Sequence, residues 1–313
     1  MNETMKKKKQ HYVPKFYLKN FAIHKKSGEF SIRCYNKERD KWYSSNITQV
    51  AMERYFYEKR DPPKIENYFS QLEGQHATVY HKIISKSTIE NLTSEEKFTM
   101  AQYLFIQNER TRSMRVRNSQ ITKLVYKYLE KKGELPPYKK LDARYKKWLL
   151  ESRGAMGQFN IMFNPIEDEQ GNLHEPKEIV EIISKLDWIL VKNNLKSEFY
   201  TSDHPVMVWN PPPSEDGVIQ GYGFQSYNVD GVEIYFPLAP RLCLVLFDGR
   251  VSKYKNFRLT KEVIQEELDW INTQIIAMAH RTVFTKSNDF QFVRKRIKEY
   301  PEIKDPNRMR LYF

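Results

Sequence analysis

The stretch "QHYVPKFYLKNFA", residues 10–22, places one histidine, two tyrosines, two phenylalanines and one proline directly behind a run of lysines. We call it the N-terminal strip. Pro14 biases Val13 towards extended backbone, so we expect this strip to lie flat against the rest of the protein. Its aromatic side chains are suited to anchor it by burial. An imidazole adds little to such anchoring and titrates near neutrality, so we expect His11 to line a polar site.

The composition is that of a folded globular protein, with 313 residues of which 40% are hydrophobic and 14% aromatic. This length favours two domains, or one domain with a large elaboration. No apolar run is long enough to span a membrane. The only cysteines are Cys34 and Cys243. Two cysteines are too few for a disulfide framework or a cysteine-based zinc site, and this small number favours a cytoplasmic location.

The net charge of +13 is distributed unevenly along the chain. Residues 1–150 contain 32 Lys+Arg and 16 Asp+Glu, a net of +16, whereas the remaining residues contain 20 and 23, a net of −3. This asymmetry favours nucleic acid as a partner of the first half, because lysine and arginine neutralise phosphates and release counterions. The alternative is a lysine-rich surface that merely keeps the protein soluble.

The first half of the chain is predicted to be mainly helical. Residues 30–43 alternate apolar and polar about a charged turn, which predicts a β-hairpin. Apolar residues at three- and four-residue spacing predict an amphipathic helix over 64–86. Thr93 and Glu96 form a capping box for a helix from Ser94 towards Lys132. A third helix is expected over about 141–153.

The second half is predicted to be rich in strands. A loop-rich stretch, 154–175, is the expected linker between a basic helical domain, 1–153, and a β-rich domain, 176–313. Pro176 opens a short helix. Strands are expected at 188–191, 199–202, 206–209, 233–236, 242–247 and 282–285, with an amphipathic helix near 264–275. The predicted fold class is α+β, with a mostly helical N-terminal half packed on an antiparallel β-rich C-terminal half.

The segment "FIQNERTRSMRVR", residues 105–117, holds four arginines in eight residues. On a single helix Arg110 and Arg117 share a face, whereas Arg112 and Arg115 lie on another. We therefore expect Gln107, Arg110 and Arg117 to face the site, where guanidinium groups can bind phosphate in bidentate fashion. The alternative is an exposed charged helix with local ion pairs.

Carboxylates supply a second candidate pattern. Glu66 and Glu73 are two turns apart on nearly the same helix face, and Glu73 and His76 are i, i+3 neighbours. The sequence has no second Glu-x-x-His, so a ferritin-like di-iron site is not expected. With Asp203, the two glutamates could hold one magnesium or manganese ion. Alternatively the glutamates are solvated, and Asp203 closes an Asx-type turn before Pro205.

Four stretches carry a family likeness: "HYVPKFYLKNF", "IENYFSQLE", "FIQNERTR" and "TSDHPV". They resemble the bacterial and archaeal family known as domain of unknown function 4238, which is recognised by its N-terminal HYVP motif, and the likeness covers most of the chain. The resemblance implies positions but no established reaction. The matching positions are His11, Tyr12, Pro14, Tyr17, Phe21, Glu66, Glu73, Gln107, Arg110, Arg112, Ser202, Asp203 and Pro205.

The main functional hypothesis is a phosphodiesterase that acts on nucleic acid, either a ribonuclease or a deoxyribonuclease with a toxin or antiviral-defence role. The sequence has no glycine-rich phosphate loop, nucleophile elbow or dinucleotide fingerprint, so a nucleotide cofactor is not expected. A divalent cation, magnesium or manganese, is the possible cofactor. The expected catalytic residues are His11, Tyr12, Glu66, Glu73, Gln107, Arg110 and Asp203, and the expected substrate-binding residues are Arg112, Arg117 and Lys15.

Within this hypothesis His11 is the general base or acid, and Arg110 and Arg112 stabilise the charge on phosphorus. Glu66, Glu73 or Asp203 serves as a second proton carrier or as a metal ligand. Two alternative hypotheses remain: a non-catalytic nucleic-acid-binding or regulatory module, and a scaffold for an acidic partner. An enzyme needs these groups to converge, whereas a binding surface needs only an open basic stripe.

Overall fold

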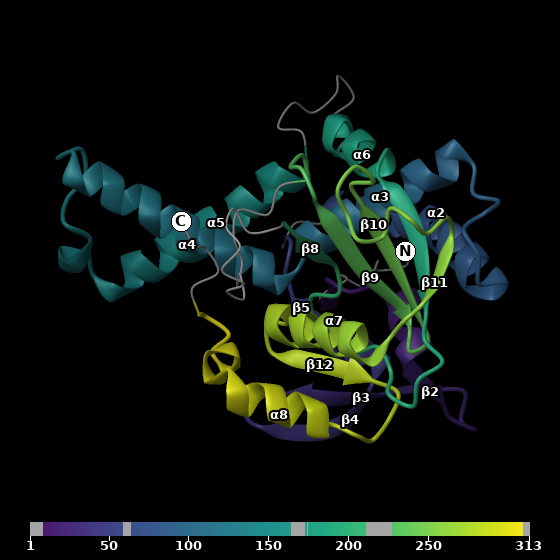
Figure 1. Cartoon of the computed structure of the whole chain (residues 1–313). Helices are drawn as coiled ribbons and strands as arrows, with labels where there is room; N and C mark the ends of the chain where they lie inside the picture. Colours follow the sequence, from purple (N-terminus) through teal and green to yellow (C-terminus); the bar gives the residue numbers. More distant parts are fainter. Residues whose placement is uncertain (1–8, 59–63, 164–172, 174, 211–226, 309–313) are drawn as a thin grey trace, which may run out of the picture.

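The computed structural model describes residues 9–58, 64–163, 173, 175–210 and 227–308. Helices and three sheets form a mixed structure, with most of the helical residues in the first half (Figure 1). The predicted α+β fold class is confirmed. Among the described residues, no helix combines the length and the apolar character that crossing a membrane requires.

The N-terminal strip begins as an edge of the smallest sheet. Strand β1 (Lys9–His11) pairs antiparallel with β5 (Met52–Arg54). The backbone N–H of Tyr12 continues this pairing to the Ala51 carbonyl at 3.0 Å. The chain then turns through α1 (Lys15–Leu18) and a 3-10 turn at Lys19–Phe21. The extended conformation ends with this pairing, and the chain bends at Tyr12 and Val13 before Pro14.

The larger sheet has the strand order β11-β6-β10-β9-β8. Its strands are antiparallel except for the β11–β6 pair, and they comprise β6 (Asp187–Lys192), β8 (Met207–Trp209), β9 (Glu233–Ala239), β10 (Leu242–Phe247) and β11 (Thr260–Glu262). Alternate side chains of β10 enter two separate core clusters, Leu244 in one and Val245 in the other. Both faces of this sheet are therefore buried.

Helices cover the two faces of the larger sheet. One core cluster joins it to α2 (Lys64–Lys86), α3 (Ser94–Glu109) and α6 (Lys177–Ser184). The other joins it to α7 (Gln265–Met278), which lies between the two large sheets in Figure 1. The predictions of the helix at 64–86 and of the capping box at Thr93 are confirmed.

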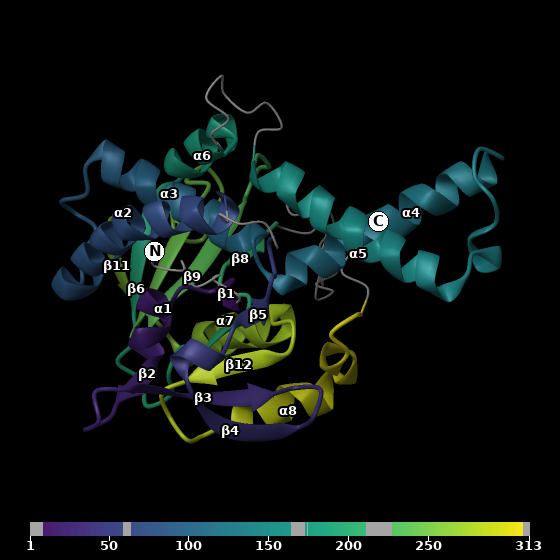
Figure 2. The ribbon, with the colours of Figure 1, turned by 180° about the vertical axis from the view of Figure 1, so that it is seen from behind.

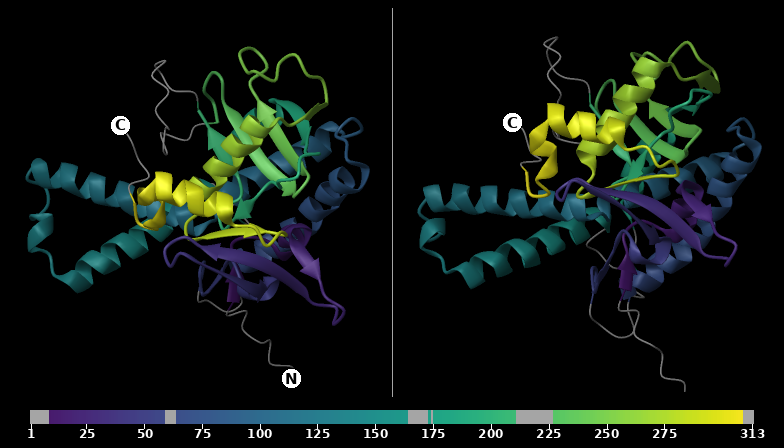
Figure 3. Two further views of the ribbon diagram at one scale, coloured as in Figure 1. Left: turned by 60° about the horizontal axis from the view of Figure 1, so that its bottom comes forward. Right: turned by 90° about the horizontal axis from the view of Figure 1, so that it is seen from below.

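The second large sheet combines strands from both ends of the chain (Figure 3). Its order is β2-β3-β12-β7, with β4 beside β3. The hairpin expected at 30–43 is present as β3 and β4. The elements of this region are β2 (Ala22–His24), β3 (Phe30–Asn36), β4 (Lys41–Asn46), a 3-10 turn at Ile47–Gln49, β7 (Thr201–Ser202), β12 (Thr282–Thr285), α8 (Gln291–Glu299) and a 3-10 turn at Pro301–Lys304.

Helices α4 (Arg112–Lys131) and α5 (Ala143–Met162) form a hairpin that projects from the two large sheets (Figures 1 and 2). We call this hairpin, with the connection at 132–142, the arm. A short 3-10 turn at Tyr138–Lys140 lies within that connection. The arm contains the helix expected near 141–153, which is longer than predicted.

The prediction of a single helix from Ser94 to Lys132 is wrong, because the chain leaves the helical conformation at Thr111. Thr111 is extended, with φ −82° and ψ 164°. Its hydroxyl lies 2.7 Å from Nδ1 of His204, a residue remote in sequence. A tertiary hydrogen bond thus fixes the break, and Arg110 and Arg117 end up on different helices.

The expected linker at 154–175 begins inside α5, which continues to Met162. Residues 164–172 and 174 lie outside the described residues. On either side of this stretch the two halves share structure, because β3 pairs with β12 and one core cluster contains residues of both.

Candidate functional site

The aromatic side chains of the N-terminal strip are anchors in the core. Tyr12, Tyr17 and Phe21 are buried. The Tyr17 ring stacks on Phe236 of β9 with a centroid distance of 4.9 Å. Its hydroxyl donates a hydrogen bond to the Pro237 carbonyl at 2.8 Å. The expectation that these rings hold the strip by burial is confirmed.

His11, at the end of β1, is partly buried beside three cations. Its pKa is lowered from 6.5 to about 4 by burial and by the positive charges of Lys15, Arg110 and Lys9, against an opposing hydrogen bond with the Thr48 backbone. The imidazole is therefore neutral at pH 7. Its Nε2 atom is buried and has no hydrogen-bond partner among the described residues. Leaving a buried polar atom without a partner costs stability.

Arg110 is the centre of a buried polar network at the C-terminal end of α3, where it is 2% exposed. Its Nε and Nη2 donate to Oε1 of Gln107 at 3.0 and 2.9 Å, and its Nη1 donates to Oε1 of Glu73 at 3.1 Å. Nε2 of Gln107 in turn donates to the Tyr12 carbonyl at 2.9 Å. This network ties the N-terminal strip to α2 and α3.

The structure thus brings His11, Gln107, Arg110 and Glu73 into one region, but it gives Arg110 a different position from the one expected. The guanidinium is bonded to two partners and lies 5.1 Å from the centroid of the Phe69 ring. A group held in this way is a fixed positive charge. It acts on His11 through the electric field and not through a direct hydrogen bond.

Tyr57 completes this region and was not predicted from the sequence. Its hydroxyl donates to the His11 carbonyl at 3.3 Å. Burial raises the pKa of Tyr57, Arg110 opposes this, and the negative charge of Glu66 contributes to the increase. Glu66 is therefore within electrostatic reach of Tyr57, but it is not among the groups that shift the pKa of His11. Tyr57 reaches this region through β1–β5 pairing, which no local spacing in the sequence indicates.

His76 belongs to a second buried network on α2. Its Nε2 lies 2.9 Å from Oε1 of Gln102. The Gln102 amide donates to Oε1 of Glu175 at 2.6 Å, and Glu175 also accepts a hydrogen bond from the Tyr68 hydroxyl. Burial lowers the pKa of His76 to about 4. Glu73 and His76 are i, i+3 neighbours on α2, but they belong to two separate hydrogen-bond networks.

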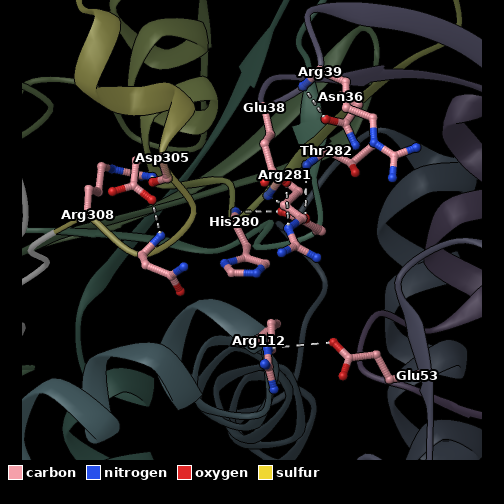
Figure 4. Close-up of polar contacts among 12 residues, drawn as sticks. Asn36, Glu38, Arg39, Glu53, Arg112, His280, Arg281, Thr282, Asp305 and Arg308 are labelled. Carbon is pink, nitrogen blue, oxygen red and sulfur yellow. Dashed lines mark hydrogen bonds and ion pairs between the residues drawn. The ribbon is translucent and has the colours of Figure 1, made fainter. Parts of the chain in front are cut away.

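Asp203 holds the connection between α7 and β12. Its carboxylate accepts backbone N–H bonds from His280, Arg281 and Thr282 at 2.7, 2.8 and 2.9 Å, and Figure 4 shows this connection. Burial raises the pKa of Asp203, while these N–H groups and the charge of Lys37 oppose the increase. The carboxylate therefore organises a turn, although the turn is distant in sequence and not the local one before Pro205.

The ion-binding set expected from Glu66, Glu73 and Asp203 is not assembled. In the part of the chain that the structure describes, no three His, Cys, Asp or Glu side chains form a group that could hold a metal ion. The reason is that Glu73 pairs with Arg110, whereas Asp203 is directed to the backbone after α7.

Tyr12 and Arg112 lie on the side of the N-terminal strip opposite His11. Burial and the negative charges of Asp203 and Glu53 raise the pKa of Tyr12, while Arg112 lowers it. Nε of Arg112 lies 3.7 Å from Oε1 of Glu53, and its side chain is 33% exposed (Figure 4). Because successive side chains of an extended strand point to opposite sides, Tyr12 and His11 meet different neighbours.

Arg117 lies beside a mostly apolar cavity of about 310 Å³ that Glu109, Ile121 and Ile161 also line. Burial raises the pKa of Glu109, and Arg117 opposes the increase. Arg117 is not among the cations that lower the pKa of His11. The expected clamp of Gln107, Arg110 and Arg117 is therefore absent, because the chain breaks at Thr111.

These features define an α+β protein whose N-terminal strip carries a neutral, partly buried histidine next to a fixed arginine–carboxylate network. The chain belongs to the family described as protein of unknown function, DUF4238, whose model matches residues 9–289. This confirms the family expected from the sequence. The matched region begins at β1 and extends past β12, so it includes both large sheets, the arm and His11. No curated protein and no solved structure matches the chain.

Proposed function

We propose that this protein is a phosphodiesterase that acts on nucleic acid, with His11 as the proton acceptor. The observation that carries the proposal is a neutral imidazole with an unpartnered Nε2 in the positive field of Lys15, Arg110 and Lys9. Attack on a phosphodiester requires removal of a proton from water or from a ribose 2′-hydroxyl. A neutral imidazole can accept that proton, and the surrounding cations favour the anionic substrate.

The proposed reaction requires the buried Nε2 of His11 to become accessible to the substrate. Nε2 then takes the proton of the attacking hydroxyl as the new bond to phosphorus forms. The negative charge on the phosphorane is stabilised by Lys15, which is exposed at the start of α1, and by the fixed charge of Arg110. The departing oxygen takes its proton from the imidazolium formed in the first step, so the proton is returned and the reaction balances. Glu73 then has a positioning role, since it holds the Arg110 guanidinium.

This arrangement makes the pKa of His11 depend on the substrate. In the free protein, burial and the neighbouring cations lower that pKa to about 4. A bound phosphate adds negative charge beside the ring, which favours the protonated imidazole and raises its pKa. Binding therefore increases the basicity of the proton acceptor at the moment when it is needed.

We place this activity in the cytoplasm, where the buried thiols of Cys34 and Cys243 stay reduced, in a toxin or antiviral-defence effector. A second candidate is a non-catalytic nucleic-acid-binding or regulatory module. It requires no reacting group beside Arg110, whose guanidinium is bonded inside the protein. A scaffold for an acidic protein is distinguished from both by an absence of nucleic-acid affinity at low salt.

The test uses the purified full chain with end-labelled single- and double-stranded RNA and DNA, with and without EDTA. We expect cleavage of at least one substrate and a rate reduced at least about 100-fold in His11→Gln, as for loss of a general base. His81→Gln, a change at an exposed histidine on α2, is the matched control and should cleave at the wild-type rate.

Intact substrates under every condition would remove the phosphodiesterase proposal and leave the binding module. Cleavage by His11→Gln at the wild-type rate would remove His11 as the proton acceptor. Where cleavage is found, the acid limb of kcat/KM should lie near pH 4, the pKa of the free protein, and the acid limb of kcat should lie higher.

A further inference from the structure

The outer part of the arm, residues 121–153, is an exposed basic surface with aromatic side chains. It contains ten Lys+Arg (123, 127, 131, 132, 139, 140, 144, 146, 147 and 153) and four Asp+Glu (130, 134, 142 and 151), a net of +6. Among its aromatic residues, Tyr128 is 57% exposed, Tyr145 is 43% exposed and Trp148 is 51% exposed. Large aromatic side chains are normally buried to a greater degree, so their exposure beside cations requires an explanation.

The arm is a rigid support for this surface. The two helices approach closely at Gly154, where an added Cβ would lie 2.1 Å from Oγ of Ser119. The Ser119 hydroxyl also donates across the helix pair to the Leu150 carbonyl at 2.9 Å. Close helix packing of this kind holds the two helix backbones that carry the aromatic residues in fixed positions, so little backbone entropy is lost when a ligand binds.

Specific contacts also hold the connection between α4 and α5 at the end of the arm. Tyr126 meets Tyr138 edge to face at 5.4 Å, and its hydroxyl donates to the Pro136 carbonyl at 3.0 Å. The ammonium groups of Lys123 and Lys146 lie 5.7 and 5.6 Å from the Tyr138 centroid. The basic residues near this end are therefore presented by an ordered turn.

Tyr145 and Trp148 are an exposed aromatic pair on this surface. Their ring centroids are 5.4 Å apart at an interplanar angle of 33°. Arg144 is exposed and lies four residues before Trp148, on the same face of α5, whereas the exposed Lys147 lies about 100° away around the helix. An aromatic pair beside a cation matches the chemistry of single-stranded nucleic acid, in which bases stack on aromatic faces and phosphates pair with cations.

We propose that residues 121–153 of the arm form a docking surface for single-stranded nucleic acid. The charge excludes a second copy of the same surface as the occupant, because two surfaces of +6 repel each other. Single strands are favoured over duplexes because only unpaired bases can stack on Tyr145 and Trp148. This surface is separate from the His11 region, and the proposal does not depend on cleavage.

The test is fluorescence anisotropy of a 5′-fluorescein-labelled 20-nucleotide thymidine strand with the full-length protein, at several salt concentrations. The charge variant is Lys139→Gln/Lys140→Gln/Lys147→Gln. Its matched control is Lys286→Gln/Lys295→Gln/Lys298→Gln, which removes the same charge from exposed lysines near β12 and on α8. The arm variant should bind at least about tenfold more weakly, and its salt slope should fall by about 2, since each lost phosphate contact contributes about 0.7.

The stacking step is tested by Trp148→Ala, which should weaken binding about tenfold without changing the salt slope. Strand binding that the arm variant weakens, in a protein that cleaves no substrate, would support this proposal although the cleavage proposal fails, so the two failures are distinguishable. Equal losses in the arm and control charge variants would overturn the proposal, as would tighter binding of a duplex of the same length. Binding to anionic phospholipid vesicles with no binding of the strand would assign the surface to membranes instead.

Discussion

The protein holds basic side chains in two different environments: the buried position of Arg110 and the exposed surface of the outer part of the arm. At the end of α3, Arg110 is buried and bonded to Gln107 and Glu73. On the arm, lysines such as Lys139 and Lys147 are exposed to solvent. In the first environment positive charge holds elements together and sets the pKa of a neighbouring imidazole. In the second it is available to a partner. The difference shows that the role of a basic residue depends on what folds against it.

The largest effect expected from this comparison is loss of stability in Arg110→Ala. The substitution leaves the side-chain oxygen of Gln107 without the two hydrogen bonds that Arg110 donates. It also removes the buried link between α2 and α3. Breaking a buried charge pair typically costs 3–5 kcal/mol, and because Glu73 is 32% exposed we expect about 3 kcal/mol. The free energy of unfolding from urea titration at pH 7 is the measurement.

The control for Arg110→Ala is Arg144→Ala, at an exposed position near the start of α5. It should leave the free energy of unfolding nearly unchanged. Arg110→Lys should recover little of the lost stability, because an ammonium group cannot reproduce the planar arrangement of donors. Equal stability of Arg110→Ala and wild type would contradict the structural role of this network.

A smaller loss of stability is expected when the pH falls from 7 to 5. This loss distinguishes buried imidazoles from exposed lysine and arginine side chains, whose charge does not change between these pH values. The pKa of His76 is about 4 in the folded protein because of burial, against 6.5 when unfolded. Protons therefore bind the unfolded state more strongly, and stability is lost as pH falls below 6.5. Between pH 7 and pH 5 this amounts to roughly 2 kcal/mol for His76.

The groups that face His76 set the size of this acid effect. Gln102 raises its pKa, Arg110 lowers it and Glu175 raises it, all less strongly than burial lowers it. The measurement is the free energy of unfolding at pH 7 and pH 5 for wild type and His76→Gln. The variant should lose less stability over this range by about the amount given. An identical loss in both proteins would place the acid sensitivity elsewhere.

The sequence predicted the elements that depend on local patterns. The helix over Lys64–Lys86, the capping box at Thr93 and the β3–β4 hairpin follow from periodicity and from residues close together in the chain. The break at Thr111 could not be predicted in this way, because it depends on a hydrogen bond to His204. Arg110 and Arg117 were expected on one helix face, and this prediction was wrong because the break was missed.

The same limit applies to the candidate site. His11, Glu73, Gln107 and Arg110 were singled out from the sequence, and the structure places them in one region. What the sequence did not show is which polar atoms are already engaged. Asp203 was expected at the site, but its partners are backbone N–H groups that follow α7, and no side-chain pattern indicates such partners.

The smallest effect is expected on the arm, and it is the sharpest check of the comparison. The variant Lys139→Gln/Lys140→Gln/Lys147→Gln removes three charges from exposed positions. Surface substitutions away from packed or bonded features usually change stability by at most about 0.5 kcal/mol. Less repulsion among the cations opposes any loss of stability. We therefore expect an unfolding free energy within about 0.5 kcal/mol of wild type, measured by urea titration at pH 7. A loss as large as that of Arg110→Ala would mean that these lysines hold the fold together, and the two environments would then no longer differ in kind.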